Sequence, residues 1–262
     1  MFRINKIFMK ACILLICTYS ALAYSADLAR ENRLYAEIVD SILDGEPLWF
    51  EGDGHKYLGI YTESAKEKSK GEVLVLHGRG LHVDWQDVIN PVRTGLTEYG
   101  WNTLSLQLPV LEKEAMYYDY AATFPDAALR IEKAIEYLKS KNPEKIIIVA
   151  HSCGFHMANT WLRLGDSSKV DAFIGIGMGA TDTGQSMVED FNFSKLKAPV
   201  LDIYGENDFG SVIGTAFTRK IMLEFFAKEK SVQIKVPAAD HYFKDKGDEL
   251  VELINNWLDN LK

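Results

Sequence analysis

Cysteine is scarce in this sequence: there are three in 262 residues, and Cys12 and Cys17 both lie among the first 23. Those residues are typical of a secretory signal peptide, because a basic start precedes a short apolar stretch and then Ala21-Leu22-Ala23, whose small side chains suit a signal peptidase. Cleavage after Ala23 would leave Cys153 as the only thiol. No internal disulfide could then form, even in an oxidising compartment, and the fold must be held by its hydrophobic core.

Long apolar runs and an excess of positive charge are also absent. No segment after residue 23 approaches the roughly 20 apolar residues that a membrane span needs. Without the first 23 residues, which hold three basic and no acidic side chains, the chain has 26 basic against 37 acidic residues, a net charge of −11. This balance disfavours nucleic acid as a partner. We predict a secreted, periplasmic protein with no membrane span after signal removal; the alternative is that residues 1–23 are retained as an anchor.

Internal repeats and low-complexity segments are missing too, so the alternation of short apolar runs with helical segments carries the fold prediction. Runs typical of β-strands occupy residues 72–76, 103–108, 145–150, 172–176, 200–204 and 232–236. A hairpin over residues 48–62 is expected before them. Buried strands that alternate with helices form a mostly parallel sheet with helices on both faces, so we predict an α/β fold in one domain, residues 24–262.

Two of the expected helices have recognisable features. Thr123 and Asp126 have the spacing of a capping box, which predicts the start of a helix there. Phe217, Ile221 and Phe225 recur every four residues, and this spacing marks one face of a later helix.

The segment around Ser152 carries the clearest chemical signal. A buried strand, residues 145–150, runs through Ala150-His151-Ser152-Cys153-Gly154 into a helical segment. A strand-to-helix turn of the form small-x-Ser-x-Gly exposes the serine oxygen at the start of the helix, and small residues are needed because backbones crowd there. Ala150 stands where glycine is usual, a difference of one methyl group. We predict that Ser152 is a nucleophile; the alternative is an ordinary capped turn.

A serine hydroxyl is a poor nucleophile unless a base lies beside it. His241 is the favoured base, because it follows the last predicted strand and precedes the C-terminal helix. The alternative is a surface histidine. The other five histidines are predicted to be structural or pocket-lining, since they lie in the early hairpin, in the loop after an early strand, in the serine turn or on the next helix: His55, His77, His82, His151 and His156.

The base needs a carboxylate that orients its ring and stabilises its charged form. Asp208 follows the penultimate strand and completes the chain order Ser, Asp, His expected of such a fold. Asp202, within the strand, and Glu206, nearer its exit, are rivals. Asp240 directly precedes His241, and side chains of sequence neighbours rarely meet productively.

Acyl transfer also needs N–H donors for the oxygen that becomes negatively charged. The backbone N–H of Cys153 is predicted to supply one, and that of Arg79, in His77-Gly78-Arg79-Gly80, the other. The Cys153 thiol is expected to be buried rather than catalytic. Neither dinucleotide-binding nor P-loop spacing occurs, and no metal-ligand motif is present, so no cofactor and no metal are expected.

Taken together, residues 150–154, residues 77–80, Asp208 and His241 resemble the α/β-hydrolase superfamily. More narrowly, an α/β-hydrolase-like family of Gram-negative envelope proteins, known only as a domain of unknown function, is similar at residues 75–80, Asp84-Trp85, residues 100–109 and residues 150–152. The resemblance extends from about residue 48 to the end of the chain. It implies an α/β-hydrolase fold and an envelope location but no substrate.

Ser152, His241 and Asp208 therefore predict a serine hydrolase that cleaves a small-molecule carboxylic ester, thioester or amide through an acyl-enzyme. The alternative is a catalytically silent hydrolase scaffold that serves as an envelope binding or assembly protein, and the presence of all three residues disfavours it. The sequence does not identify a protein partner.

The chain has room for a small cap or none, and the longest candidate flap is residues 178–198. A second pocket wall is predicted at residues 108–120, which would make the pocket partly apolar. Plain packing of that long loop is the equal alternative. Its candidate wall residues are Met116, Tyr117, Tyr118 and Tyr120.

Overall fold

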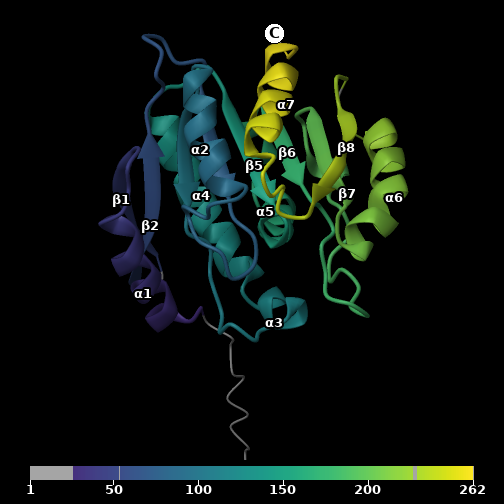
Figure 1. The fold of residues 1–262 in the computed structure, drawn as a ribbon, viewed down its shortest axis with the longest axis horizontal. Helices are drawn as coiled ribbons and strands as arrows, with labels where there is room; N and C mark the ends of the chain where they lie inside the picture. The colour runs from purple at the N-terminus through teal and green to yellow at the C-terminus, as the bar shows by residue number, and fades with distance from the viewer. Residues whose placement is uncertain (1–25, 53, 227–228, 262) are drawn as a thin grey trace, which may run out of the picture.

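The computed structural model describes residues 26–52, 54–226 and 229–261, which form an eight-stranded sheet with helices around it (Figure 1). The predicted signal segment, residues 1–23, lies outside the described residues. The strands are β1 (Glu46–Gly52), β2 (His55–Thr62), β3 (Glu72–Leu76), β4 (Asn102–Leu106), β5 (Ile146–His151), β6 (Ala172–Ile176), β7 (Val200–Asn207) and β8 (Val232–Asp240).

The strand order is β1-β2-β4-β3-β5-β6-β7-β8. Strand β2 runs antiparallel to its neighbours β1 and β4, and every pair from β4 to β8 is parallel. The predicted mostly parallel sheet with an N-terminal hairpin is therefore confirmed. Strand β8 continues to Asp240 rather than ending at residue 236, and a register shift pairs Asp240 with Asn207 of β7.

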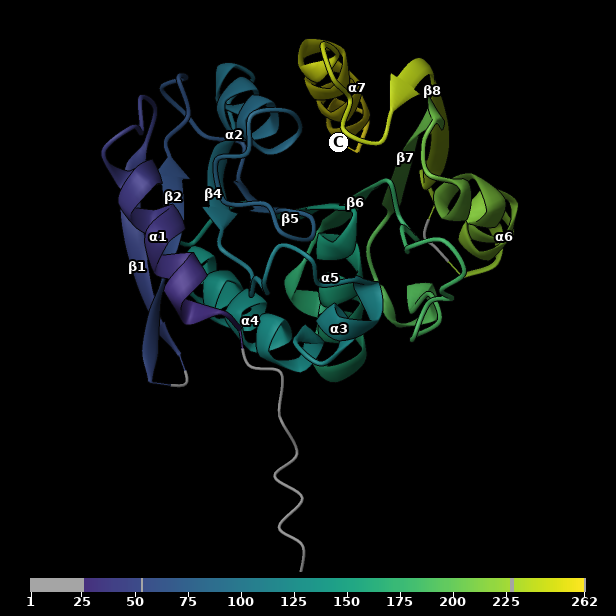
Figure 2. The ribbon, with the colours of Figure 1, turned by 60° about the horizontal axis from the view of Figure 1, so that its bottom comes forward.

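Helices cover both faces of the sheet, as Figure 2 shows: α2 and α7 lie on one face, and α4 and α5 on the other. The helices are α1 (Leu28–Val39), α2 (Ile89–Glu98), α3 (Tyr117–Ala121), α4 (Phe124–Ser140), α5 (Cys153–Leu164), α6 (Gly210–Phe226) and α7 (Gly247–Asp259). Alternate residues of β3 point to opposite faces, as a strand requires. Val73 and Val75 pack with α2 and α7, whereas Leu74 and Leu76 pack with α4 and α5.

The spacing of Phe217, Ile221 and Phe225 identified helix α6 but not its inner face. These side chains are 75%, 36% and 78% exposed. The buried face of α6 is made by Val212, Ala216, Arg219 and Leu223. Arg219 is fully buried and donates from Nε to Asp202 of β7 at 2.8 Å. An ion pair under the helix, rather than the phenylalanine row, therefore joins α6 to the sheet.

The start of α4 differs from the predicted capping box. Thr123 does precede the helix, but its side chain caps no helical N–H. Its hydroxyl instead donates to the carbonyl of Tyr120 at 2.7 Å, which ties α3 to α4. The Asp126 Oδ2 lies 3.7 Å from the Nη2 of Arg130, which is one turn further along the helix.

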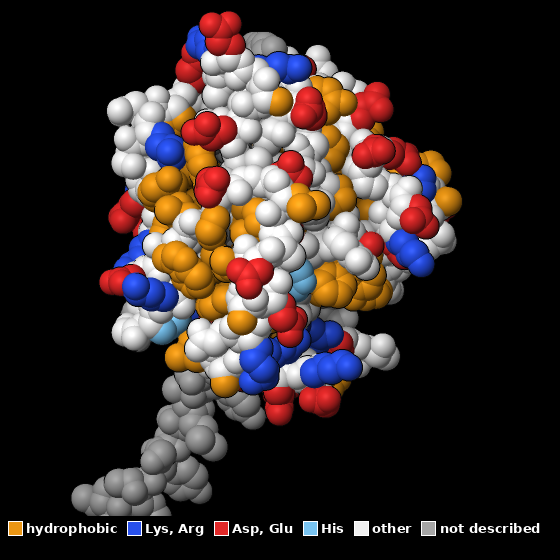
Figure 3. Space-filling model, turned by 60° about the vertical axis from the view of Figure 1, so that its left-hand side comes forward, with side chains coloured by type: hydrophobic (Ala, Val, Ile, Leu, Met, Phe, Trp, Pro, Cys, Tyr) orange, Lys and Arg blue, Asp and Glu red, His pale blue; other side chains and the backbone are white. Residues whose placement is uncertain are grey.

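No helix among the described residues is long and apolar enough to cross a membrane. On the face nearest β1, acidic side chains are interspersed with basic ones, and hydrophobic side chains show between them (Figure 3).

The carboxyl ends of the parallel strands meet at one edge of the sheet, where ligands bind in folds of this type. β3 leads there into residues 77–80, β5 into Ser152 and β7 into Asp208. β8 reaches the same edge just before His241. The fold therefore brings the predicted site residues to a common edge.

Candidate active site

Ser152 occupies a strained turn between β5 and α5. Its φ of 55° and ψ of −122° lie where residues other than glycine rarely occur, and such strain is common at functional sites. Gly154 makes this turn possible, because a Cβ there would stand 2.4 Å from the carbonyl oxygen of His77. The tight packing holds the serine side chain at the carboxyl edge of the sheet with 9% of the residue exposed.

His241 lies beside Ser152. Its Nε2 is 2.8 Å from the Ser152 Oγ, although 89 residues separate them in sequence. Only 2% of His241 is exposed. The ring of Phe209 stacks on the imidazole with a centroid distance of 3.9 Å and an interplanar angle of 18°. Phe209 thus covers one face of the histidine and restricts its rotation.

Asp208 stands on the other side of the imidazole, with Oδ1 2.6 Å from the His241 Nδ1. Burial by itself would raise the pKa of Asp208, but the hydrogen bond and charge of His241, with the backbone N–H groups of Phe209 and Gly205, bring it below its ordinary value. The carboxylate therefore stays ionised and keeps the histidine proton on Nδ1. Nε2 is then left free to accept the serine proton.

The rival acids all have other partners. Asp202 is buried against Arg219 and Gln233. Glu206 accepts from the backbone N–H of Ala238 and faces Lys235. Asp240 accepts from the backbone N–H groups of Tyr242 and Lys244. Of the four candidate carboxylates, Asp208 is the one that contacts the His241 ring.

His77 fixes the loop that follows β3. Its Nε2 accepts from the backbone N–H of Leu108 at 2.9 Å, so the proton resides on Nδ1, which donates to the Gly78 carbonyl at 2.8 Å. Burial lowers the pKa of His77 to about 3, and the ring is neutral at physiological pH. Sequence reasoning placed His77 among the structural residues, and its contacts specify that role.

The remaining histidines have no contact with Ser152 through their side chains. His151 binds the His241 carbonyl from Nε2 at 3.0 Å, and His156 binds the Ala180 carbonyl from Nε2 at 2.9 Å. His55 lies against Arg130, and His82 packs edge-on to Trp85. None of them replaces His241 beside the serine.

The predicted oxyanion donors lie close to Ser152. Cys153 begins α5, and its backbone N–H has no acceptor among the described residues; the same is true of the Arg79 N–H. The loop passes directly over the serine, since a Cβ on Gly78 would be 3.1 Å from the Ser152 Cβ. Burial raises the pKa of the Cys153 thiol to about 12, which keeps it protonated and unreactive.

The side chain of Arg79 has a partner that the sequence did not reveal. Its guanidinium forms a two-pronged ion pair with Asp182, Nη2 donating to Oδ1 at 2.7 Å and Nη1 donating to Oδ2. Asp182 also accepts from the backbone N–H of Tyr117 at 2.7 Å. The pair therefore ties residues 77–80 to the predicted flap, residues 178–198. Sequence spacing gives no signal for a contact 103 residues apart.

One cavity touches Ser152, and a larger one borders it. A cleft of about 20 Å³ touches the serine itself and is lined by Arg79, Tyr117, Ser152, Cys153, Ala180, Thr181 and Phe209. An outer cavity of about 590 Å³ shares Arg79, Thr181 and Phe209 with the cleft and extends along residues 181–185, residues 209–211 and Tyr242.

The predicted aromatic wall contributes to these cavities through one residue. Tyr117 lines the cleft. Tyr120 is buried and accepts from the Leu111 N–H, whereas Met116 and Tyr118 are 45% and 49% exposed. Of the four candidate wall residues, Tyr117 is therefore the one that contributes apolar surface to the cleft.

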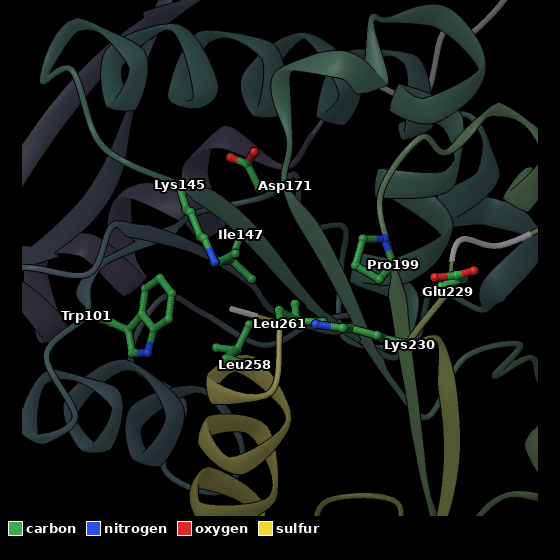
Figure 4. Close-up of a pocket in the computed structure, with 9 residues that line it drawn as sticks. All are labelled: Trp101, Lys145, Ile147, Asp171, Pro199, Glu229, Lys230, Leu258 and Leu261. Atoms are coloured by element: carbon green, nitrogen blue, oxygen red, sulfur yellow. The ribbon is translucent and has the colours of Figure 1, made fainter.

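A further cavity of about 640 Å³ lies at the opposite edge of the sheet, near the amino ends of the parallel strands (Figure 4). Its lining includes Trp101, Lys145, Asp171 and Lys230, and it contains none of the predicted site residues. Across residues 26–52, 54–226 and 229–261, no group of His, Cys, Asp and Glu is arranged to hold a metal ion.

The comparisons with known proteins agree with this architecture. The model of a family described as a protein of unknown function (DUF3530) matches residues 23–129. None of the curated proteins matches the chain in sequence.

Several solved structures are similar in fold. An α/β serine hydrolase without a lid from Xanthomonas campestris is 13% identical, with a TM-score of 0.63 over 84% of this chain and 95% of that one. A soluble variant of monoglyceride lipase from Saccharomyces cerevisiae is 15% identical, with a TM-score of 0.63 over 84% and 97%. Dienelactone hydrolase from Anabaena variabilis is 20% identical, with a TM-score of 0.59 over 82% and 98%.

At these identities the likeness shows the fold, and the chain has the α/β-hydrolase fold. The resemblance to a family of unknown function is confirmed over residues 75–80, Asp84-Trp85 and residues 100–109, which lie within the matched part of the chain; residues 150–152 lie outside it.

Proposed function

We propose that this chain, an α/β-hydrolase by fold, is a serine hydrolase that cleaves a carboxylic ester with Ser152, His241 and Asp208 as its catalytic triad. One observation carries the proposal. A continuous line of hydrogen bonds runs from the Ser152 Oγ through both nitrogens of His241 to Asp208, at 2.8 and 2.6 Å. This is the arrangement that activates a serine for attack on a carbonyl.

In the proposed reaction the Ser152 oxygen attacks the ester carbonyl while His241 takes its proton on Nε2. Asp208 stabilises the resulting imidazolium. The N–H groups of Cys153 and Arg79 hold the negative oxygen of the tetrahedral intermediate, a contribution of roughly 3 kcal/mol per donor. His241 then gives its proton to the leaving oxygen as the carbon–oxygen bond of the ester breaks. A water molecule that loses a proton to His241 next attacks the acyl carbon, the bond from that carbon to the Ser152 oxygen breaks, and the serine takes the proton back from His241.

The surroundings of the three residues support catalysis rather than a silent scaffold. A strained backbone at Ser152 is retained although it costs about 1–3 kcal/mol. The backbone N–H groups of Cys153 and Arg79, which have no acceptor within the described part of the chain, are available to a substrate oxygen. Both features suit a serine that attacks a carbonyl, because the turn exposes the hydroxyl and the N–H groups can hold the negative oxygen.

Covalent labelling tests the proposal. A methyl fluorophosphonate, small enough for the cleft, should add one phosphonyl group to the wild-type protein and none to Ser152→Ala. Ser168→Ala, which changes an exposed serine between α5 and β6, is the matched control and should be labelled like the wild type. Intact-protein mass spectrometry reads the result. Absence of labelling in all three proteins would favour the binding or assembly scaffold.

A further inference from the structure

The cleft at Ser152 and the outer cavity that borders it differ greatly in size. A cleft of about 20 Å³ touches the serine, against about 590 Å³ in the outer cavity. A cavity needs roughly 10–15 Å³ to hold one water molecule, so the small cleft favours a short acyl group over a long one. The outer cavity falls within the usual range for small-molecule sites, roughly 300–1,000 Å³.

The position of His241 shows which cavity takes the leaving group. The imidazolium protonates the departing oxygen, so the leaving group must lie on the histidine's side of the serine. Tyr242 packs edge-on to His241 with ring centroids 5.1 Å apart and lines the outer cavity but not the cleft, whereas Phe209, which stacks on His241, lines both. The cleft extends the other way, toward Tyr117 and Ala180, and is therefore the acyl side.

Hydrogen bonds connect the residues that form the walls of the cleft. The hydroxyl of Tyr117 lies 3.3 Å from the His156 Nδ1, and the His156 Nε2 donates to the Ala180 carbonyl at 2.9 Å. Burial lowers the pKa of His156 to about 4, so the neutral ring can accept on one side and donate on the other. Across the cleft, Asp182 joins the Tyr117 backbone to Arg79. These bonds resist the widening that a long acyl chain would need.

The outer cavity offers polar partners and aromatic faces together. The ion pair of Arg79 and Asp182 lies at its border with the cleft. Thr183 and Gln185 supply a hydroxyl and an amide group, whereas the Thr181 and Ser211 hydroxyls donate to the Gln185 and Thr181 carbonyls and can only accept from a ligand. Phe209 and Tyr242 are 41% and 38% exposed and present ring surface to a ligand. Hydroxyl-binding side chains beside exposed rings match an alcohol that carries many hydroxyl groups.

We propose that the site is specific for acetyl esters of polyhydroxylated alcohols, such as an O-acetylated sugar. The inference rests on the proposed function, since it assigns the two halves of the substrate to the two sides of Ser152. Acetate would be the acyl group transferred to the serine, and the sugar hydroxyl would leave with the proton from His241.

A chain-length series tests the acyl side in the wild-type protein. The kcat/KM for 4-nitrophenyl acetate should exceed that for the octanoate at least tenfold. Tyr117→Ala should reduce this preference several-fold by opening the cleft. Tyr118→Ala, a change in the same helix at a residue that does not line the cleft, should keep it. Equal rates for acetate and octanoate in the wild type would overturn the proposal.

Acetate release tests the leaving side. The protein should release acetate from 6-O-acetylglucose at least tenfold faster than from hexyl acetate. Tyr242→Ser should reduce this ratio, whereas Tyr99→Ser, a change at an equally exposed tyrosine in the C-terminal turn of α2, should not. Faster release from hexyl acetate would overturn the proposal.

Phosphonate labelling separates the two possible failures. Labelling of Ser152 together with a preference for octanoate or hexyl acetate would reject the substrate class alone. Absence of labelling would reject the hydrolase function and the substrate class with it.

Discussion

His151 holds the backbone of His241: the Nε2 of its imidazole lies 3.0 Å from the His241 carbonyl oxygen, although 90 residues separate the two. Burial lowers the pKa of His151 to about 3, so the ring is neutral at physiological pH and donates from Nε2. His151 directly precedes Ser152. One hydrogen bond therefore joins the turn that positions the serine to the loop that positions its base.

Removal of that bond should lower kcat more than it changes KM. We expect His151→Leu to reduce kcat about 10- to 100-fold, because a shift of about 1 Å between reacting groups has an effect of that size. His151→Gln retains an N–H donor and should recover most of the loss. Steady-state kinetics with 4-nitrophenyl acetate, beside circular dichroism to verify folding, provide the measurement. Equal losses in both variants would show that the ring fills space rather than orients His241.

Asp208→Asn should lower kcat by about 10⁴-fold, because the amide no longer stabilises the imidazolium and favours the wrong tautomer of His241. Glu206→Gln is the matched control. It changes an exposed carboxyl group two residues away that has no contact with the histidine, and its kcat should stay within a factor of two of the wild type. If both variants kept wild-type kcat, the assignment of Asp208 would be wrong.

Acidification should destabilise the protein through three buried histidines. Burial lowers the pKa of His77 and His151 to about 3 and that of His156 to about 4. In the unfolded chain their pKa is about 6.5, so between these values the unfolded state binds more protons and the free energy of unfolding rises with pH. The loss on acidification below about pH 6.5 should approach 1.4 kcal/mol per pH unit for each histidine.

Urea unfolding at pH 7, 6 and 5 measures this slope. His156→Leu removes one of the three histidines that bind a proton in the unfolded chain. The free energy of unfolding should then depend less steeply on pH, by about 1.4 kcal/mol per pH unit. A free energy of unfolding that does not change over this range would contradict the prediction.

Two glycine substitutions should have opposite effects on stability. Gly154→Ala places a Cβ 2.4 Å from the His77 carbonyl oxygen and should lower the free energy of unfolding by more than about 2 kcal/mol. Gly214→Ala, in α6, meets no atom within 4 Å and should raise it by about 0.5–1 kcal/mol. Urea unfolding of both variants measures the difference. Similar stability for the two would show that the serine turn relaxes more easily than its packing indicates.

The sequence by itself determined the parts of this protein that depend on neighbouring residues. Ser152 could be located because strand, turn and helix follow one another within a few residues. His241 and Asp208 could be proposed because parallel strands bring their carboxyl ends to one edge. The alternation of strands and helices was sufficient to predict the mostly parallel sheet.

Only the tertiary structure decided which distant groups meet. The choice of Asp208 over Asp202 depended on Arg219, which binds Asp202 from another element. The ion pair of Arg79 with Asp182 likewise joins segments that are far apart in sequence, and so does the hydrogen bond from His156 to the Ala180 carbonyl. The row of Phe217 and Phe225 faces solvent, because α6 packs on the sheet with a different face, which holds the buried Arg219 as well as apolar side chains. Periodicity is a property of one segment, whereas these contacts depend on how several segments pack together.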